Sequence, residues 1–180
     1  MNEAELIRGC IQGDRKAQNL LYQKYKGLLF AMCCRYSSDK EEAKDIFQES
    51  FIKIFSNIQS FEQKGSFDGW LKRITCNTAL TYYRKNKKKP EKLDESGDVE
   101  DVTENTSWLE TIPQEALLHA VSSLPEELRL VFNMVAIEGF SHKEASEMLD
   151  IKEETSRTRL LRARKRLIEQ LTKEYKKVVQ

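Results

Sequence analysis

The apolar residues of this chain recur mostly at intervals of three or four positions, which places them on one face of an α-helix. Glycine and proline are sparse, and stretches that alternate apolar and polar residues are rare. The pattern therefore predicts an all-α protein. The apolar positions of the first three predicted helices are Leu20, Leu21, Tyr25, Leu28, Leu29, Met32 and Tyr36; then Ala43, Ile46, Phe47, Phe51, Ile54, Phe55 and Ile58; then Trp70, Leu71, Ile74, Ala79, Leu80 and Tyr83.

Side chains that commonly cap helices stand just before each of these three sets. Asp14 precedes the first set, Ser38 or Asp39 precedes the second, and Ser66 precedes the third. Their oxygen atoms can accept hydrogen bonds from the free N–H groups of a first helical turn. We expect residues 1–89 to form one small helical domain.

After the basic run RKNKKKP the chain becomes strongly acidic. The segment from Glu91 to Glu110 contains many acidic residues but a single lysine. Its apolar residues are few and show no periodic spacing. Low hydrophobicity combined with high net charge is typical of a flexible segment. We predict a flexible acidic linker over residues 90–111, which either is a solvated loop or imitates nucleic acid in a basic channel.

The helical pattern returns after Pro113, so residues 112–180 are expected to form a second small helical domain. Its apolar positions include Leu117, Leu118, Val121 and Leu124, followed by Leu128, Val131, Phe132, Val135 and Ile137. Ser141 and Glu144 then form a capping box ahead of a short helix. A tight turn and a longer, arginine-rich helix follow, and this is the layout of a helix-turn-helix.

The arginine-rich helix has a distinct apolar stripe and a basic face. The residues of the stripe recur at helical spacing and should face the core: Leu160, Ala163, Leu167 and Leu171. The opposite face carries Thr155, Thr158, Arg162 and Lys165, and the flank carries Arg157 and Leu161. Leu161 would be exposed unless something covers it. A charge run of this kind is usually a solvated face with internal ion pairs. Acidic partners are scarce between Arg157 and Arg166, so we favour binding of a polyanion such as DNA.

Composition adds few constraints to this interpretation. The formal charge is only +1, although 33% of the residues are charged. The four cysteines form no CxxC pair and two are adjacent, which favours a reduced chain in which they serve as small apolar residues. No stretch is apolar over the roughly 18 residues of a membrane span, and the start lacks the layout of a signal peptide. We expect a cytoplasmic protein without membrane insertion.

The segment KDIFQESFIKIF places Asp45, Gln48 and Glu49 on one face of the second predicted helix and its apolar residues near the other. An acidic, polar stripe of this kind suggests a protein partner rather than DNA. The two histidines, His119 and His142, are far away in sequence, and the sequence contains no metal-ligand cluster. We therefore expect no enzyme, no catalytic residue, no metal and no cofactor.

Aromatic and basic residues alternate between Phe61 and the lysine run that ends at Lys89. Aromatic rings accept unstacked bases and lysines follow phosphates, so this segment suits single-stranded DNA. Asn77 offers both a donor and an acceptor for a base edge. Trp70 is expected to be core, whereas Phe61 fits the core and a DNA surface equally well.

Four stretches together resemble the extracytoplasmic-function (ECF) sigma factors of the sigma-70 family. They are DIFQESFIKIF, SFDGWLKRITCNTALTYYRK, LPEELRLVFNMVAIEGFSHKEASEML and TSRTRLLRARKRL. They occur in the family's order and lie within residues 1–89 and 112–172. The resemblance implies a sigma factor that directs core RNA polymerase to specific promoters and initiates transcription, with region 2 in residues 1–89 and region 4 in residues 112–180.

The resemblance also implies roles for individual residues. Core polymerase would be bound by Asp45, Gln48, Glu49 and Ile52; the melted −10 element by Asn57, Phe61, Lys64, Gly65 and Asn77; and the duplex −35 element by Arg157, Thr158, Arg159, Leu161, Arg162 and Lys165. An anti-sigma factor is a candidate partner for these surfaces.

Two features limit the resemblance. Glu154 stands where family members often have glycine, so a −35 preference cannot be transferred. Glu153 and Glu154 favour the positive end of the helix dipole, yet they weaken nonspecific DNA binding. Three rivals stay open: a stand-alone helix-turn-helix transcriptional regulator that binds its operator without polymerase, a helical nucleic-acid enzyme, and a protein adaptor, which leaves the arginine-rich helix unexplained.

Overall fold

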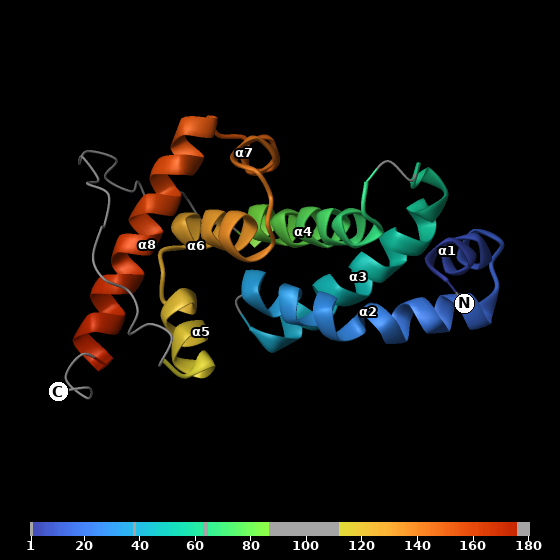
Figure 1. The fold of residues 1–180 in the computed structure, drawn as a ribbon, viewed down its shortest axis with the longest axis horizontal. Coiled ribbons are helices and arrows are strands. Elements are labelled where there is room, and N and C mark those ends of the chain that lie inside the picture. Colours follow the sequence, from blue (N-terminus) through green and yellow to red (C-terminus); the bar gives the residue numbers. More distant parts are fainter. Residues whose placement is uncertain (1, 38, 63–64, 87–111, 176–180) are drawn as a thin grey trace. The chain divides into compact units, whose positions relative to one another are not determined.

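The computed structural model describes residues 2–37, 39–62, 65–86 and 112–175 (Figure 1). These residues form helices and no β-strand, so the predicted all-α class is confirmed. The chain divides into two compact units, Met1–Pro90 and Glu91–Gln180. The predicted acidic linker, residues 90–111, lies outside the described residues, and the assignment of roles to domains 1–89 and 112–180 stays a prediction.

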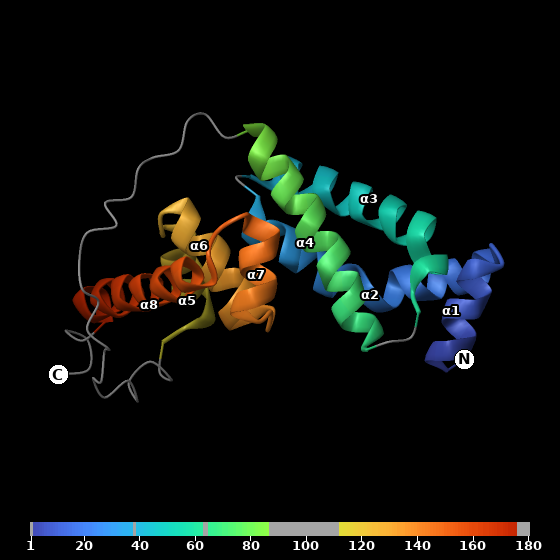
Figure 2. The same ribbon diagram turned by 90° about the horizontal axis from the view of Figure 1, so that it is seen from above.

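The described residues of the first unit, within 2–86, form four α-helices and one short 3₁₀ helix. They are α1 (Glu3–Ile11), α2 (Arg15–Tyr36), α3 (Lys40–Asn57), η1 (Ile58–Ser60) and α4 (Phe67–Asn86). The long helix α2 packs against α1, α3 and α4, and α3 also packs along α4 (Figure 2). Figure 2 separates the three long helices of this unit most clearly.

The helix starts in the first unit follow the side-chain caps expected from the sequence. Asp14 accepts a hydrogen bond from the Lys16 N–H, and Asp39 accepts one from the Glu42 N–H. The Ser66 hydroxyl accepts one from the Gly69 N–H at 2.9 Å. Asp14, Asp39 and Ser66 are therefore confirmed as helix starts, whereas Ser38 lies outside the described residues.

Helix α1 was not predicted, although its start carries a local signal. Asn2 caps the helix and Glu5 completes a capping box with it. A Cβ atom on Gly9 would lie 2.6 Å from the Ala17 side chain, so glycine is what allows α1 to approach α2 this closely.

The core of the first unit is rich in aromatic side chains. Its fully buried part includes Tyr25, Phe51 and Phe67, and Phe47, Phe55, Phe61, Trp70 and Ile74 pack against it while staying partly exposed. Not every apolar residue of the α2 pattern reaches this core, because Leu20 and Leu28 are exposed whereas their sequence neighbours Leu21 and Leu29 are buried. Successive residues point in directions about 100° apart around a helix, and at these two positions only the second leucine of each pair is turned toward the core.

In the described part of the second unit, residues 112–175, short helices pack against one long helix. Its elements are α5 (Gln114–Ser122), α6 (Glu126–Phe132), the π-helix η3 (Asn133–Ile137), α7 (His142–Leu149) and α8 (Glu153–Tyr175). Helices α5, α6 and α7 each pack against α8, and they lie along the same side of it (Figure 1). The core between them is almost entirely aliphatic.

The helix-turn-helix formed by α7 and α8 is confirmed in its local details. Ser141 and Glu144 form the predicted capping box at the start of α7. Asp150 ends α7 with φ 56° and ψ 50°, the left-handed conformation that aspartate tolerates better than most residues. This conformation reverses the chain so that α8 can begin at Glu153.

The π-helix η3 changes which residues reach the core. Val135 and Ile137 belong to the apolar pattern of the predicted helix, but Ile137 is 39% exposed and Val135 is only partly buried. Asn133 and Met134 are fully buried instead. A π turn contains one more residue than an α turn, so it rotates the following side chains away from the face that a regular helix predicts.

Candidate nucleic-acid and polymerase interfaces

Helix α8 presents its basic and hydroxyl side chains away from the core of its unit. Leu160, Ala163, Leu167 and Leu171 are all buried, as the helical spacing predicts. On the other faces Arg162 and Thr158 are partly exposed and Lys165 is exposed. Burying the aliphatic stripe fixes the rotation of α8, and this rotation gives the basic face access to a partner.

Two arginines of α8 form ion pairs in different directions. Arg157 pairs along the helix with Glu153, and both side chains are substantially exposed. Arg159 pairs with Glu127 of α6 at 2.6 Å, and both of these side chains are mostly buried. Arg159 thus holds α8 against α6, and its assignment as a DNA contact stays a prediction.

Leu161 lies outside the buried stripe, as expected, but it is partly rather than fully exposed. The neighbouring Thr158 hydroxyl donates to the Glu154 carbonyl oxygen at 3.0 Å, one turn back. That bond engages the Thr158 hydroxyl, and Thr158 is partly exposed. Leu161 and the methyl group of Thr158 are the kind of apolar contacts that recognise the methyl group of thymine.

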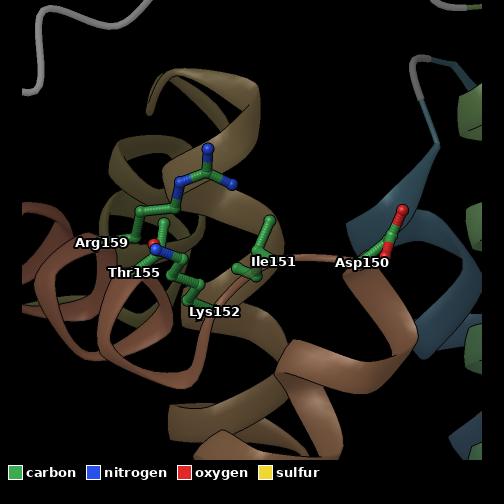
Figure 3. A pocket seen from close by; sticks show the side chains of 5 residues that line it. All are labelled: Asp150, Ile151, Lys152, Thr155 and Arg159. Carbon is green, nitrogen blue, oxygen red and sulfur yellow. The ribbon is translucent and has the colours of Figure 1, made fainter.

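A shallow hollow lies at the turn between α7 and α8, lined by Asp150, Ile151, Lys152, Thr155 and Arg159 (Figure 3). In Figure 3 the Asp150 carboxylate points away from Lys152 and Arg159. The cations of this turn are therefore not neutralised by Asp150.

His142 connects the two helices of the helix-turn-helix. Its Nδ1 atom lies 2.9 Å from the hydroxyl of Ser156, which is fully buried on α8. Burial lowers the pKa of His142, and the positive charge of Arg157 lowers it further. No local sequence pattern predicts this contact, because its partners lie on different helices.

Helix α3 carries the stripe predicted to bind polymerase. Asp45 and Gln48 are exposed, and Ile52 is 66% exposed, the largest value among the exposed large apolar side chains of the described residues. Glu49 is partly buried and pairs with Lys53, one turn along, at 2.6 Å. A single exposed apolar side chain is common on protein surfaces, so the assignment of this stripe to polymerase binding stays a prediction.

Glu49 is held more firmly than the rest of this stripe. A hydrogen bond from Lys53 keeps the pKa of Glu49 below its usual range, and a further hydrogen bond from Tyr82 of α4 adds to this effect. Burial, followed by the bond to Glu49, raises the pKa of Tyr82. Lys53 stands four residues after Glu49, so its role could have been found from spacing, whereas Tyr82 on another helix could not.

The residues predicted to bind the −10 element lie around the end of α3 and along α4. Asn57 is exposed, and its Nδ2 donates to the Lys53 carbonyl oxygen at 2.8 Å. Asn77 is also exposed, and Gly65 adopts φ 106°, a conformation that favours glycine. Lys64 lies outside the described residues.

Phe61 belongs both to the core and to the surface. Its ring centroid lies 5.1 Å from that of Phe67 and 5.6 Å from that of Trp70, and Phe67 and Trp70 stack on each other. Phe61 and Trp70 nevertheless remain partly exposed. The three rings form an aromatic cluster in which Phe61 and Trp70 are partly exposed, so the two interpretations of Phe61 are compatible.

The described part of the chain contains no group of three or more His, Cys, Asp or Glu side chains that could hold a metal ion. In the same residues, no helix combines the length and apolar character of a membrane span. Cys10, Cys33 and Cys76 are buried and Cys34 is exposed, and these four cysteines are not joined in disulfides.

Comparison with known proteins identifies the family. The description "Sigma-70 region 2" matches residues 21–89, and "Sigma-70, region 4" matches residues 114–167. The ECF RNA polymerase sigma-E factor of Haemophilus influenzae is 31% identical over 175 residues, which cover 91% of this chain and 92% of that protein. The chain belongs to the ECF sigma factors of the sigma-70 family. This sigma factor directs core RNA polymerase to promoters for the initiation of transcription.

Other relatives agree with this family. The RNA polymerase sigma-H factor of Pseudomonas aeruginosa is 28% identical to this sigma factor over 173 residues, 90% of each chain. The fold resembles the sigma factor RpoE in complex with the anti-sigma factor NepR from Bartonella quintana, with TM-score 0.60, 23% identity and coverage of 86% of this chain and 96% of that chain. It also resembles CnrH in complex with the cytosolic domain of CnrY, with TM-score 0.57, 21% identity and coverage of 92% and 94%.

Proposed function

We propose that this sigma factor divides promoter recognition between its two units. In the second unit, α8 contacts the duplex −35 element through Arg157, Thr158, Leu161, Arg162 and Lys165, with Arg159 bound to DNA as well as to Glu127. The observation that carries this assignment is the burial of the whole aliphatic stripe of α8, because it leaves the basic face outside. Arginine pairs with guanine and apolar groups contact thymine in a major groove.

The first unit is proposed to bind polymerase and the opened strand. The exposed Ile52, with Asp45, Gln48 and Glu49, forms the polymerase surface on α3. Near the end of the same helix, Asn57 and the partly exposed ring of Phe61 are available to unstacked bases, with Gly65 and Asn77 on the adjacent segment and Lys64 contributing a cation. Stacking on an aromatic ring is tolerant of base identity, so Asn57 and Asn77 would supply the hydrogen bonds that select a base.

Under this proposal the chain catalyses no reaction itself. Polymerase forms the phosphodiester bonds, while the sigma factor supplies binding energy at two places on one promoter and so favours strand opening. The protein would act in the cytoplasm, where it meets polymerase. The two solved relatives bound to NepR and to CnrY support an anti-sigma partner for this chain as well.

The −35 assignment is tested with Arg162→Ala in the full chain, assembled with core polymerase on promoters randomised in the −35 element. The substitution is expected to cost about 1–3 kcal/mol of promoter binding and to relax selection at one position. Lys173→Ala is the matched control, because it removes one exposed cation from the same helix three turns away. Unchanged selection in Arg162→Ala contradicts the assignment.

A further inference from the structure

The first turn of α8 contains an ion pair whose position suggests a role in specificity. Glu153 is the first residue of α8, and its carboxylate pairs with the Arg157 guanidinium one turn later. A glutamate four residues before a basic residue is the favourable order on a helix, and carboxylates are favourable near a helix N-terminus. Both side chains remain substantially exposed, so the pair is formed on a surface that DNA can approach.

A carboxylate next to Arg157 changes what that arginine can bind. An exposed arginine facing DNA is attracted to phosphates, which supply affinity without sequence selection. The carboxylate of Glu153 repels phosphates, and it accepts a hydrogen bond from one nitrogen of the Arg157 guanidinium. Arginine carries five N–H donors, so donors remain for the two acceptors that guanine presents in the major groove.

Glu154 provides a natural comparison within the same turn. It is also acidic and exposed and lies equally close to the helix N-terminus, but its carboxylate has no ion pair or hydrogen bond with the residues that the structure describes. Any effect of first-turn negative charge alone should therefore be the same for Glu153 and Glu154. An effect that depends on holding Arg157 should belong to Glu153 only.

We propose that Glu153 is a positioning residue that sets promoter specificity: it holds the Arg157 guanidinium for a guanine edge in the −35 duplex and withholds it from phosphates. This rests on the proposed role of α8 at the −35 element. Glu153 itself contacts no base, and its contribution is expressed through Arg157.

The test uses full-length Glu153→Gln, Arg157→Ala, the double variant and the control Glu154→Gln, each assembled with core polymerase. Binding is measured on promoters randomised in the −35 element at several salt concentrations. Glu153→Gln should lose about fivefold of the preference for guanine at one position and bind mismatched promoters more tightly. The slope of log affinity against log salt should become steeper by about one, because Arg157 then contacts a phosphate.

Two comparisons separate this mechanism from simple charge removal. In the Arg157→Ala background, Glu153→Gln should change the base preference no further, since the coupling passes through Arg157. Glu154→Gln should raise affinity for all promoters and leave the guanine preference at that position unchanged. Arg157→Lys, which keeps the charge but lacks the planar fork, should lose the preference and keep the parental salt slope.

The results that overturn the inference differ from those that overturn the proposed function. If Arg157→Ala changes selection at one position but Glu153→Gln behaves as Glu154→Gln does, Glu153 is only a first-turn charge and the inference is wrong. If Arg157→Ala alters no position of the −35 element, the role of Arg157 in duplex recognition is wrong, and the role of Glu153 is lost with it.

Discussion

The two units of this sigma factor have cores of different chemistry, and their surfaces differ accordingly. The first unit packs phenylalanine, tyrosine and tryptophan rings, several of which remain partly exposed. The second unit packs mainly alanine, valine and leucine, and its accessible face on α8 is made of cations, hydroxyl groups and Leu161. Partly exposed aromatic rings suit stacking of unpaired bases, whereas a basic helix suits an intact major groove.

This difference shows how a small domain can use its core for binding. In the first unit, Phe61 contributes to stability and to a candidate base-stacking surface at once. In the second unit these tasks are separate, because the buried stripe of α8 stabilises the fold and other residues of that helix face outward. Substitutions should therefore couple stability and function in the first unit more than in the second.

The largest expected effects test whether the two cores are independent. Leu71→Ala in α4 and Leu128→Ala in α6 each remove a fully buried side chain and should each cost about 2–5 kcal/mol of unfolding free energy. Each change should affect only its own unit. Hydrogen exchange of backbone amides in the full chain measures this, and equal loss of protection in both units would show one cooperative core.

The next largest effect concerns the polymerase surface of the first unit. Ile52→Glu places a charge where an exposed apolar side chain is proposed to enter an interface, and it should weaken binding to core polymerase by about 2 kcal/mol or more. Leu20→Glu on α2 is the control, because Leu20 is also exposed. Equal losses for the two variants, measured by titration of core polymerase, would show that α3 has no special role.

A smaller effect is expected from the aromatic surface. Phe61→Leu keeps an apolar side chain against Phe67 and Trp70 but removes the flat ring, so promoter opening should lose about 1–3 kcal/mol while the closed complex is preserved. Phe55→Leu is the matched control, since Phe55 is also a partly buried ring on the same core. Permanganate reactivity of the −10 thymines reports opening, and normal opening in Phe61→Leu counts against base stacking there.

The smallest effect is a pH dependence confined to the second unit. His142 has a lowered pKa, so the folded state binds its proton more weakly than the unfolded chain does. The corresponding stability is present above about pH 6.5, the ordinary histidine value, and is lost as the pH falls from there through the lowered pKa. Burial is the main cause; the charges of Arg157 and Arg164 act in the same direction, and that of Glu153 opposes them.

Thermal unfolding between pH 7.5 and 5 checks this dependence. His142→Gln should reduce the loss of stability of the second unit on acidification. His119→Gln replaces the exposed histidine of α5 and should leave the dependence as it is in the parent. An identical pH profile for His142→Gln and the parent would mean that another group causes it.

Local sequence signals predicted the parts of the structure that local forces determine. Asp14, Asp39, Ser66 and the capping box of Ser141 start helices because a side chain satisfies N–H groups two or three residues away. The buried stripe of α8 follows in the same way from helical spacing. The N-terminal helix α1 has a comparable local signal, the capping box of Asn2 and Glu5.

Features that depend on contacts between helices could not be predicted in this way. The ion pair of Arg159 with Glu127 and the contact of His142 with Ser156 join residues on different helices. The π-helix η3 likewise shifts the buried face by one residue, and no local sequence pattern predicts this shift. At the candidate sites, the sequence predicted which residue types occur on each helix. Only the structure showed which of these side chains form ion pairs and hydrogen bonds with one another.

The division of labour between the units is tested most directly by site-specific photo-crosslinking in the complete polymerase complex. A photoreactive residue is placed at Phe61 or at Leu161 of the full chain, and crosslinks are mapped on promoter DNA before and after opening. The account predicts that position 161 crosslinks to the −35 duplex in both states, and that position 61 crosslinks to one strand of the −10 element only after opening. Crosslinks from both positions to the same element, or a crosslink from position 61 to closed duplex DNA, would contradict it.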